Sequence, residues 1–237
     1  MIAGIMQPYF FPYFGYFDHI FRCDTWVVFD ITQYTPKSWM TRNRILKQNS
    51  GWTYINCDVH GTQSMFTHEV KLINIEKTKD QLLGKIAHYK KKAPFYNKVY
   101  SIINETFSMC QTNSLTDISV CGLTTVCQYL SIPFNPIIAS HEKFTLPPIT
   151  YSGQWALEIC TVLGASEYLN TPGGREIFRP EAFKKRNIRL GFTRVPEFSY
   201  DCTPYQFESN LSILDVLMWN SPKTIHSRMG QDPIDYV

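Results

Sequence analysis

Several basic and polar residues near position 40 have types and spacings that suit the binding of an anionic ligand. Lys37, Arg42 and Arg44 lie within eight residues, together with Trp39 and Asn43. Ammonium and guanidinium groups pair with phosphates, and an indole ring offers a surface for stacking. A run of charges is more often a solvated face, but this close mixture of Trp, Asn and Arg favours binding. We therefore expect these five residues to contact substrate.

A second group of polar residues surrounds two glycines in the sequence Asn170-Thr-Pro-Gly173-Gly174-Arg175, which follows a short predicted strand. Two glycines expose backbone N–H groups, and an arginine adds a two-pronged donor for carboxylate or phosphate. A Gly-Gly pair alone is most often a turn. With the asparagine and arginine beside it, the segment predicts ligand binding by Asn170, Gly173, Gly174 and Arg175.

The loop after the first predicted strand carries the next group of candidate residues, which comprises Gln7, Tyr13, Gly15 and Tyr16. Residues 13–16 have the H-x-G-H spacing of the P-x-H-x-G-H loop of nucleotidylyltransferases, with Tyr13 and Tyr16 where histidines would stand and Pro12 just before them. The glycine would let a phosphate or ribose approach the backbone. Tyrosines form hydrogen bonds but cannot stabilise a leaving pyrophosphate by positive charge. A buried aromatic plug of the core is the alternative interpretation.

Two carboxylates complete the set. Asp30 ends the second predicted strand, and we expect it to be the general base that deprotonates an amine. The sequence requires no metal, although Asp30 could hold Mg²⁺ beside a diphosphate. Asp215 lies within an apolar helical segment, where a buried carboxylate needs a partner. That partner is either an arginine or an amine in the cleft.

These residues are expected to be held by an α/β fold. A strand at 2–6, a helix and a strand at 25–30 have the length of a βαβ crossover, which favours a parallel sheet. We predict one α/β domain over residues 1–237, with a mainly parallel sheet of Rossmann-like or nucleotidylyltransferase-like type and a helical C-terminal part. A loop or sub-domain junction is expected near 145–152. Further predicted strands are 52–59, 67–73, 167–170 and 188–195; predicted helices are 79–89, 94–107, 117–130, 154–163, 180–186, 211–219 and 222–229.

Composition narrows the class of protein. Charged residues make up only 18% of the 237 and aromatic residues 15%, which favours a deep, partly apolar cleft. A net charge of +3 argues against a polybasic nucleic-acid arm. The seven cysteines are odd in number and form no CxxC, so we expect free thiols. Without a signal-like or spanning apolar segment, the chain is expected to be soluble and cytoplasmic, with no membrane insertion.

The combined motifs resemble the WbqC-like family. They are Gln7-Pro8…Pro12-x-x-Gly15-Tyr16-Phe17, Asp30…Gln33, Trp39…Arg42-Asn43-Arg44, Tyr89…Ala93-Pro94-Phe95, Leu163-Gly-Ala…Tyr168-x-Asn170…Gly173-Gly174-Arg175 and Asn210…Asn220. Together they span nearly the whole chain. Family members occur in bacterial O-antigen and other surface-polysaccharide gene clusters, and are associated with adding an amino-acyl group, typically glycine, to an amino sugar. A related proposal for the family is amino-acid transfer to modified bases of phage DNA.

The resemblance implies a cytoplasmic bacterial transferase of lipopolysaccharide O-antigen biosynthesis. It would join a glycyl-type unit to a nucleotide-linked amino sugar or another phosphorylated small molecule. No cofactor is required for this reading, and a nucleic acid is not the expected partner. One alternative is an amino-acid transferase that acts on modified DNA bases. The other is a non-catalytic nucleotide-sugar-binding protein, which fits the missing histidines of the first loop.

Overall fold

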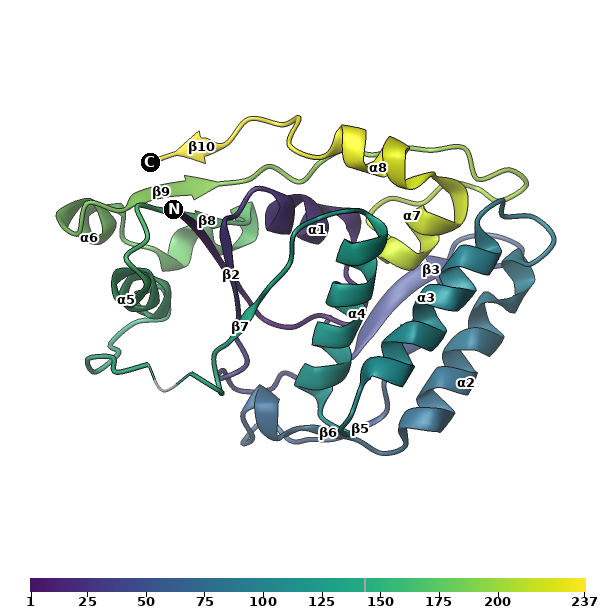
Figure 1. The fold of residues 1–237 in the computed structure, drawn as a ribbon, viewed down its shortest axis with the longest axis horizontal. Coiled ribbons are helices and arrows are strands. Elements are labelled where there is room, and N and C mark those ends of the chain that lie inside the picture. Colours follow the sequence, from purple (N-terminus) through teal and green to yellow (C-terminus); the bar gives the residue numbers. More distant parts are fainter. Residues whose placement is uncertain (143) are drawn as a thin grey trace.

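The computed structural model describes residues 1–142 and 144–237, and a six-stranded sheet lies at its centre (Figure 1). The strand order is β10-β9-β8-β1-β2-β7. The pairs from β9 to β7 are parallel, and only β10 runs antiparallel to its neighbour. The mainly parallel α/β fold is therefore confirmed. The strands are β1 (Ile2–Met6), β2 (Thr25–Val28), β7 (Ile137–Ile138), β8 (Glu167–Asn170), β9 (Arg189–Phe192) and β10 (Asp235–Tyr236).

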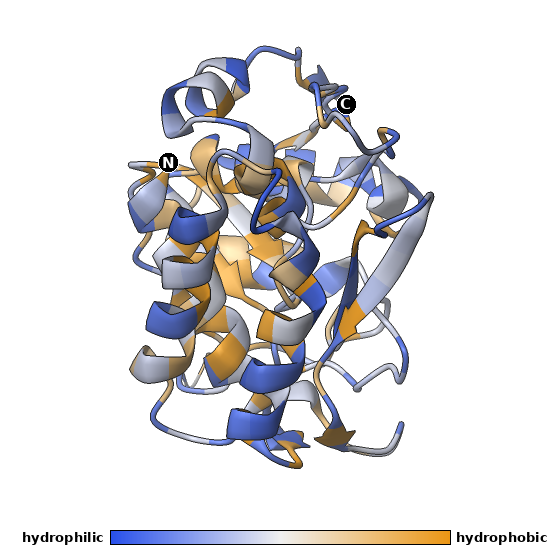
Figure 2. Ribbon diagram, turned by 90° about the vertical axis from the view of Figure 1, so that its right-hand side faces the viewer, coloured by the Kyte–Doolittle hydropathy of each residue, from blue (hydrophilic) through white to orange (hydrophobic). Residues whose placement is uncertain are grey.

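Helices bury both faces of the sheet. Alternate residues of a strand point to opposite faces, so Ala3, Ile5 and Val27 pack with the side chains around α5 and α6. Trp26 and Val28 join the second cluster, which contains the other helices. Figure 2 shows hydrophobic residues concentrated on the central strands and hydrophilic ones on the outer helix surfaces. The crossover helices are α1 (Phe14–Phe21), α5 (Gln154–Leu163) and α6 (Pro180–Lys185).

A long insertion separates β2 from β7 in the chain. It begins with a hairpin of β3 (Arg42–Leu46) and β4 (Trp52–Asn56) and a short ribbon of β5 (Val59–His60) and β6 (Lys71–Leu72). The predicted strand at 67–73 is wrong for its first half, because Thr67–Glu69 forms a 3₁₀ turn, η1. Three helices follow: α2 (Ile75–Ile86), which runs into η2 (Ala87–Tyr89), then α3 (Tyr96–Met109) and α4 (Leu115–Tyr129).

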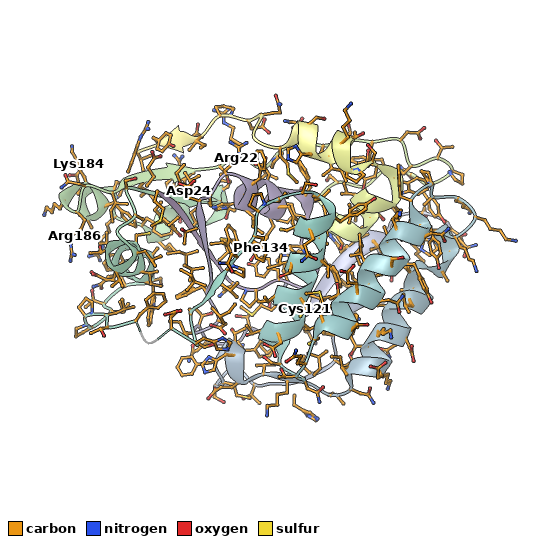
Figure 3. The ribbon with its side chains drawn as sticks, in the orientation of Figure 1. Arg22, Asp24, Cys121, Phe134, Lys184 and Arg186 are labelled. Atoms are coloured by element: carbon orange, nitrogen blue, oxygen red, sulfur yellow. The ribbon has the colours of Figure 1, made fainter. Side chains whose placement is uncertain are left out.

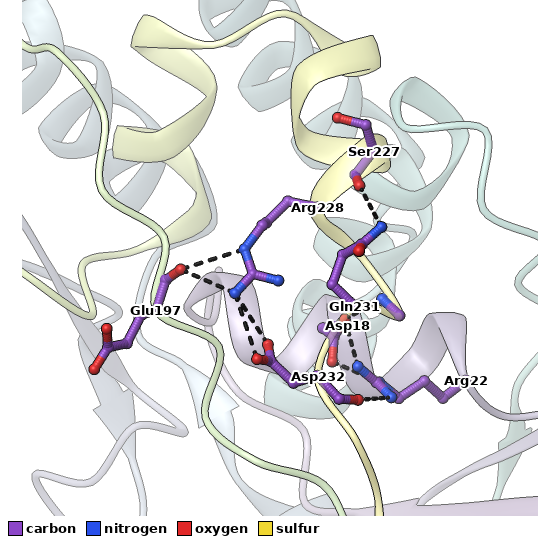
Figure 4. A network of polar contacts seen from close by, with 8 residues as sticks. Asp18, Arg22, Glu197, Ser227, Arg228, Gln231 and Asp232 are labelled. Atoms are coloured by element: carbon purple, nitrogen blue, oxygen red, sulfur yellow. Dashed lines mark hydrogen bonds and ion pairs between the residues drawn. The ribbon is translucent and has the colours of Figure 1, made fainter.

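The C-terminal part is helical, as predicted, with α7 (Ile213–Trp219) and α8 (Pro222–Arg228). A polar network then fastens the tail across α1 (Figure 4). The buried Asp18 accepts from Arg22 Nε at 2.7 Å and from the Gly230 N–H at 2.7 Å. Arg22 also donates to the Asp232 carbonyl, and the Asp232 carboxylate pairs with Arg228. The guanidinium of Arg228 in turn donates to the Glu197 carbonyl. These contacts fix residue 197, which belongs to the site described below.

An ion pair joins α6 to α5, and the cysteines form no disulfide among the described residues. Arg186, which Figure 3 labels at the end of α6, pairs with Glu158 of α5, with 3.6 Å between nitrogen and oxygen. All seven cysteines lie in the described part of the chain, and all are unpaired. Within that part, no helix is both long and apolar enough to cross a bilayer.

Candidate functional site

The site lies where the sheet changes its direction of winding. The chain passes from β1 to β2 on one side and returns through β8 on the other, so β1 and β8 form a topological switch point. In open α/β sheets, ligands bind outside the carboxyl ends of the strands at this point. Gln7 directly follows β1 and Asn170 ends β8. Both line a cavity of about 580 Å³, which we call the switch-point cavity.

Hydrogen bonds hold the two amides in place. Gln7 donates from Nε2 to the Thr32 hydroxyl at 3.1 Å, and its backbone carbonyl accepts from the Tyr16 hydroxyl at 2.8 Å. The Asn170 carboxamide oxygen accepts from the Thr171 N–H at 2.6 Å, and its nitrogen donates to the Tyr168 hydroxyl. The amides are thus fixed before any ligand arrives, which lowers the entropic cost of binding.

The switch-point cavity is neutral and aromatic. Among the described residues, those that line it include no charged side chain. The 3₁₀ helix η3 (Pro172–Ile177) brings Gly173 and Gly174 to one wall, and the start of α5 forms another. Gly153 permits this approach, because a Cβ there would lie 2.3 Å from the Ile177 carbonyl oxygen. Such a lining suits a flat or hydroxylated ring better than a phosphate. The aromatic members are Tyr9, Phe29, Trp155, Tyr168 and Phe178.

Tyr9 also lines a neighbouring cavity of about 220 Å³, which we call the arginine cavity. Its cationic member is Arg44, whose guanidinium lies over the rings of Trp39 (5.5 Å) and Trp52 (5.0 Å). The guanidinium also donates to the Asn210 carbonyl at 3.2 Å. No carboxylate of the described residues forms an ion pair with Arg44. Its charge is therefore available to an anionic ligand.

Asn43 shapes this cavity through the backbone. Its side-chain nitrogen donates to the carbonyls of Phe10 (3.3 Å) and Phe11 (2.9 Å), and its oxygen accepts from the Arg44 N–H. Phe11 has a φ of 40°, in the left-handed region, which a phenylalanine adopts only when its surroundings impose it. Asn43 thus holds the loop after β1 against β3. It lines the arginine cavity but is 97% buried, with 3% of its surface exposed.

A third cavity, of about 420 Å³, extends the site past α1. It shares Tyr13, Val195 and Asn210 with the arginine cavity. Its charged members are Glu197 and Glu208, so we call it the glutamate cavity. Gly15 lies in its wall, together with the aromatic residues Phe14, Phe198, Tyr200 and Phe207. Neighbouring cavities of the three share lining residues, and we call the three together the cleft; a neutral part, a cationic part and an acidic part follow one another in it.

Tyrosine hydroxyls in the cleft are hydrogen-bond donors at neutral pH. Burial raises the pKa of Tyr13 to about 12, with smaller contributions from Tyr9 and Asp18. Burial also raises the pKa of Tyr9. Neither hydroxyl can therefore serve as a base near pH 7. The carboxylates of the glutamate cavity are the ionisable acceptors of the cleft.

Asp30 lies at the predicted edge of the sheet but outside the cleft. Its side chain is fully buried, and its two oxygens accept from the Ser140 N–H at 2.9 Å and the Ser140 hydroxyl at 2.6 Å. Its backbone carbonyl accepts from the His68 N–H. This geometry gives Asp30 the task of joining the ends of β2 and β7. Asp30 is not among the lining residues of the switch-point, arginine or glutamate cavity.

We expect Asp30→Asn to lower the free energy of unfolding by about 1–3 kcal/mol, because an amide nitrogen leaves one Ser140 donor unpaired. Ligand binding in the cleft should not change. Urea denaturation and ligand titration of the same variant measure both quantities, and Ser140→Ala is the matched control for the broken contact. An intact stability together with lost turnover would instead restore Asp30 as the base.

Four further predicted site residues also lie away from the cleft lining. Tyr16 is buried, and its ring packs on Trp26 at 5.3 Å while its hydroxyl fixes Gln7. Lys37 and Arg42 line a separate cavity. The Arg175 side chain is 48% exposed; it lies over the Phe192 ring at 4.6 Å and approaches Asp235 at 3.9 Å. The turn of η3 that presents Gly173 and Gly174 to the cavity directs Arg175 elsewhere.

Asp215 forms no ion pair with an arginine of the described residues, and it does not line the cleft, where an amine would bind. Its carboxylate accepts from the Leu46 N–H at 2.8 Å, from Tyr200 at 3.0 Å and from the Tyr89 hydroxyl. Burial raises the pKa of this carboxyl. Because Tyr200 lines the glutamate cavity and Leu46 ends the strand that carries Arg44, Asp215 supports the cleft from behind.

Sequence reasoning missed several residues of the cleft. Trp155 stands at the start of α5, and the βαβ pattern does place a helix start at the edge of the sheet. Tyr9 lies between two predicted site residues, so its position was a usable signal. Glu197 and Glu208 occur in an irregular segment, and only the folded chain brings them next to Tyr13.

An open α/β fold with a ligand-sized cleft at its switch point defines the class of this protein. Comparison with known families then places it further: the model of the WbqC-like protein family matches residues 7–227, and the chain belongs to that family. It is also 26% identical over 222 residues to an uncharacterised protein, Rv1507c, of Mycobacterium tuberculosis strain H37Rv, covering 91% of this chain and 92% of that protein. No solved structure matches the chain.

Proposed function

We propose that this protein is a transferase of surface-polysaccharide biosynthesis that joins a glycyl-type amino-acid unit to a nucleotide-linked amino sugar or a similar phosphorylated acceptor. The observation that carries the proposal is the order of charges along the cleft. A neutral aromatic cavity, a single arginine and a pair of carboxylates follow one another, and share Tyr9 and then Tyr13. A ligand with a ring, a phosphate and an amine has the same order of groups.

Each cavity receives the group that its lining favours. The ring of the acceptor binds between the aromatic side chains of the switch-point cavity, with hydrogen bonds from Gln7 and Asn170. The phosphate lies against the guanidinium of Arg44. The rings of Trp39 and Trp52 hold this guanidinium in place. The amine lies in the glutamate cavity, where Glu208 is half-buried and Glu197 exposed.

The chemistry then needs few protein groups. An amine must lose a proton before its nitrogen can attack an acyl carbon, and a carboxylate of the glutamate cavity accepts that proton. The new C–N bond forms while the bond from the acyl carbon to its activating group breaks, and that group leaves with the electron pair. Holding the two reactants side by side is the larger contribution of the cleft.

A thermal-shift screen with nucleotide sugars tests the binding step. A ligand at one hundred times its dissociation constant adds about 2.7 kcal/mol of stability, which corresponds to about 5–10 °C in Tm for a chain of this size. We expect this rise with nucleotide amino sugars. Stabilisation by oligonucleotides alone would favour the transferase that acts on DNA bases.

Arg44→Gln is expected to weaken nucleotide-sugar binding ten- to hundredfold, because a charge-assisted hydrogen bond is worth about 1.5–3 kcal/mol. Arg175→Gln is the matched control, since Arg175 also lies over an aromatic ring but outside the cleft lining. The affinity of Arg175→Gln for the nucleotide sugar should equal that of the wild type. Calorimetric titration measures both variants, and equal losses in the two would contradict the proposed path of the ligand.

One observation favours the non-catalytic alternative. Within the described part of the chain, the switch-point cavity contains no ionised side chain, and both carboxylate oxygens of Asp30 already accept hydrogen bonds from Ser140. A nucleotide-sugar-binding protein would need nothing more. Mass spectrometry of the acceptor after incubation with an activated aminoacyl donor separates the two functions, because only a transferase adds the mass of the acyl unit.

A further inference from the structure

The outer side of the β3–β4 hairpin contains a second cavity for an anion, which the cleft does not use. It has a volume of about 520 Å³, and we call it the hairpin cavity. Its cationic members are Lys37 and Arg42. It shares no lining residue with the arginine cavity, although Arg42 and Arg44 are only two positions apart on β3. The group of basic residues that the sequence presents as one is therefore divided between two places.

Aromatic side chains account for this division. The guanidinium of Arg42 lies over the Tyr54 ring with 4.4 Å between its central carbon and the ring centre. The rings of Trp39 and Trp52 hold Arg44. Each arginine is fixed by its own rings, and stacking covers only the face of a guanidinium. The terminal N–H groups of Arg42 are left to bind a planar or tetrahedral anion, whereas its Nε is buried.

Arg42 has donors that the protein itself does not satisfy. Its Nε is buried and has no hydrogen-bond partner among the described residues. No ion pair of those residues involves Lys37 or Arg42. Because Nε itself is shielded from solvent, an acceptor from outside would meet the two terminal Nη groups, which are not buried and donate to none of the described residues. Oxygen atoms of a phosphate have the geometry and charge for this place.

Lys37 completes the pair of cations. It stands in the loop before β3 with a φ of 55°, and the Ser38 hydroxyl donates to the Thr35 carbonyl at 2.7 Å in the same turn. This turn carries the ammonium group to the cavity that Arg42 lines. Asp58 and Asn56 stand on the same rim. Both side chains can form hydrogen bonds with hydroxyl groups of a ligand, and the carboxylate of Asp58 disfavours an anion that has no such groups.

We propose that the hairpin cavity is a binding site for the phosphate group of a small hydroxylated molecule such as a sugar phosphate, with Arg42 and Lys37 as its anion-binding residues. The site is separate from the cleft and does not depend on the proposed transferase function. It requires only that the phosphate oxygens reach the terminal N–H groups of Arg42.

Glucose 1-phosphate is the probe for the test, with calorimetric titration at low ionic strength. In the Arg44→Gln background, where the cleft has lost its cation, the probe should still bind. Arg42→Gln should weaken this binding at least tenfold, and Lys37→Gln by a smaller factor. Lys47→Gln is the control, because Lys47 is exposed on the same hairpin but lines none of the cavities described.

Hydrogen exchange on the wild-type protein keeps the test decisive if Arg42→Gln does not fold. Glucose 1-phosphate should slow exchange in peptides that cover residues 36–42 and 54–61, and leave residues 7–15 and 195–211 unchanged. Binding that disappears with Arg44→Gln and survives Arg42→Gln would overturn the proposal. So would protection confined to the cleft, or the absence of any binding at millimolar probe. Nucleotide-sugar binding that is lost in Arg44→Gln but kept in Arg42→Gln reports on the proposed function, because the first substitution leaves the hairpin cavity intact and the second leaves the cleft intact.

Discussion

Asp215→Ala is expected to lower the free energy of unfolding by about 4 kcal/mol, one of the largest effects of a single substitution in this protein. The carboxylate accepts from the Leu46 N–H and from the hydroxyls of Tyr89 and Tyr200. Alanine leaves the Leu46 N–H and the Tyr200 hydroxyl without this acceptor, at a residue that is 1% exposed, whereas the Tyr89 hydroxyl keeps the Leu46 carbonyl at 3.3 Å. Each unpaired buried donor costs about 1–3 kcal/mol.

Asp215→Asn separates the hydrogen bonds from the charge. Burial raises the pKa of this carboxyl, so the folded protein pays part of the cost of desolvating the ionised form. Asparagine removes that cost and keeps one acceptor. Its loss of stability should therefore be less than half of that of alanine. Urea denaturation of both variants, with Glu105→Ala on the exposed side of α3 as control, measures the difference. Equal losses would show that the charge itself holds the network.

The sequence predicts best where local chemistry and tertiary structure agree. The run Ile2–Met6 forms β1, and Gln154–Leu163 forms α5. Gly164 ends that helix with a φ of 67°, which glycine adopts without strain. The segment Glu167–Asn170 forms β8. Because strand ends in a parallel sheet define the binding edge, the positions of Gln7 and Asn170 followed from these elements alone.

Prediction failed where contacts between distant residues decide the structure. The hairpin strand β3 contains two arginines and an asparagine, and such residues are typical of a loop. It is a strand because Asn43 and Ile45 are buried on one face, while aromatic rings cover the arginines on the other. Arg175 shows the same limit. Its two glycines do reach the cleft, but the 3₁₀ turn rotates the arginine towards Asp235.

The sequence also does not predict which side chains form hydrogen bonds with one another. Asp30 lies two residues beyond the end of β2, and Ser140, 110 positions later in the chain, donates to both of its carboxylate oxygens. The sequence around Tyr16 is compatible either with a ligand contact or with a buried position in the core. It is buried and supports Gln7 from within. Residue type and spacing identify which groups can do chemistry, whereas packing decides which of them face a ligand.

Lowering the pH from 7 to 4 is expected to remove about 3 kcal/mol of stability through a single histidine. His19 is fully buried in α1, and burial lowers its pKa from 6.5 to about 4. Its Nε2 donates to the Leu169 carbonyl at 3.1 Å, while Nδ1 is buried without a partner among the described residues. Protonating Nδ1 would place a charge in the core, next to the Trp26 ring.

The direction follows from the two pKa values. Below pH 6.5 the unfolded chain binds a proton that the folded protein binds only near pH 4. The unfolded state is therefore favoured as the pH falls through this range, by about 2 kcal/mol at pH 5 and about 3 kcal/mol at pH 4. Above pH 6.5 the contribution of His19 is constant. Other acidic groups add their own pH dependence, so the wild type alone does not isolate this residue.

The variant His19→Gln isolates the contribution of His19 to the pH dependence of stability. The glutamine amide can still donate towards the Leu169 carbonyl but does not titrate, so the difference in stability between wild type and variant should shrink by about 2 kcal/mol between pH 7 and pH 5. Urea denaturation at the two values measures this difference, and His141→Gln, in a turn far along the chain, is the control. NMR titration of the His19 ring gives the pKa directly. A ring that titrates near 6.5 in the folded protein would show that this residue is accessible to water and that the acid sensitivity comes from other groups.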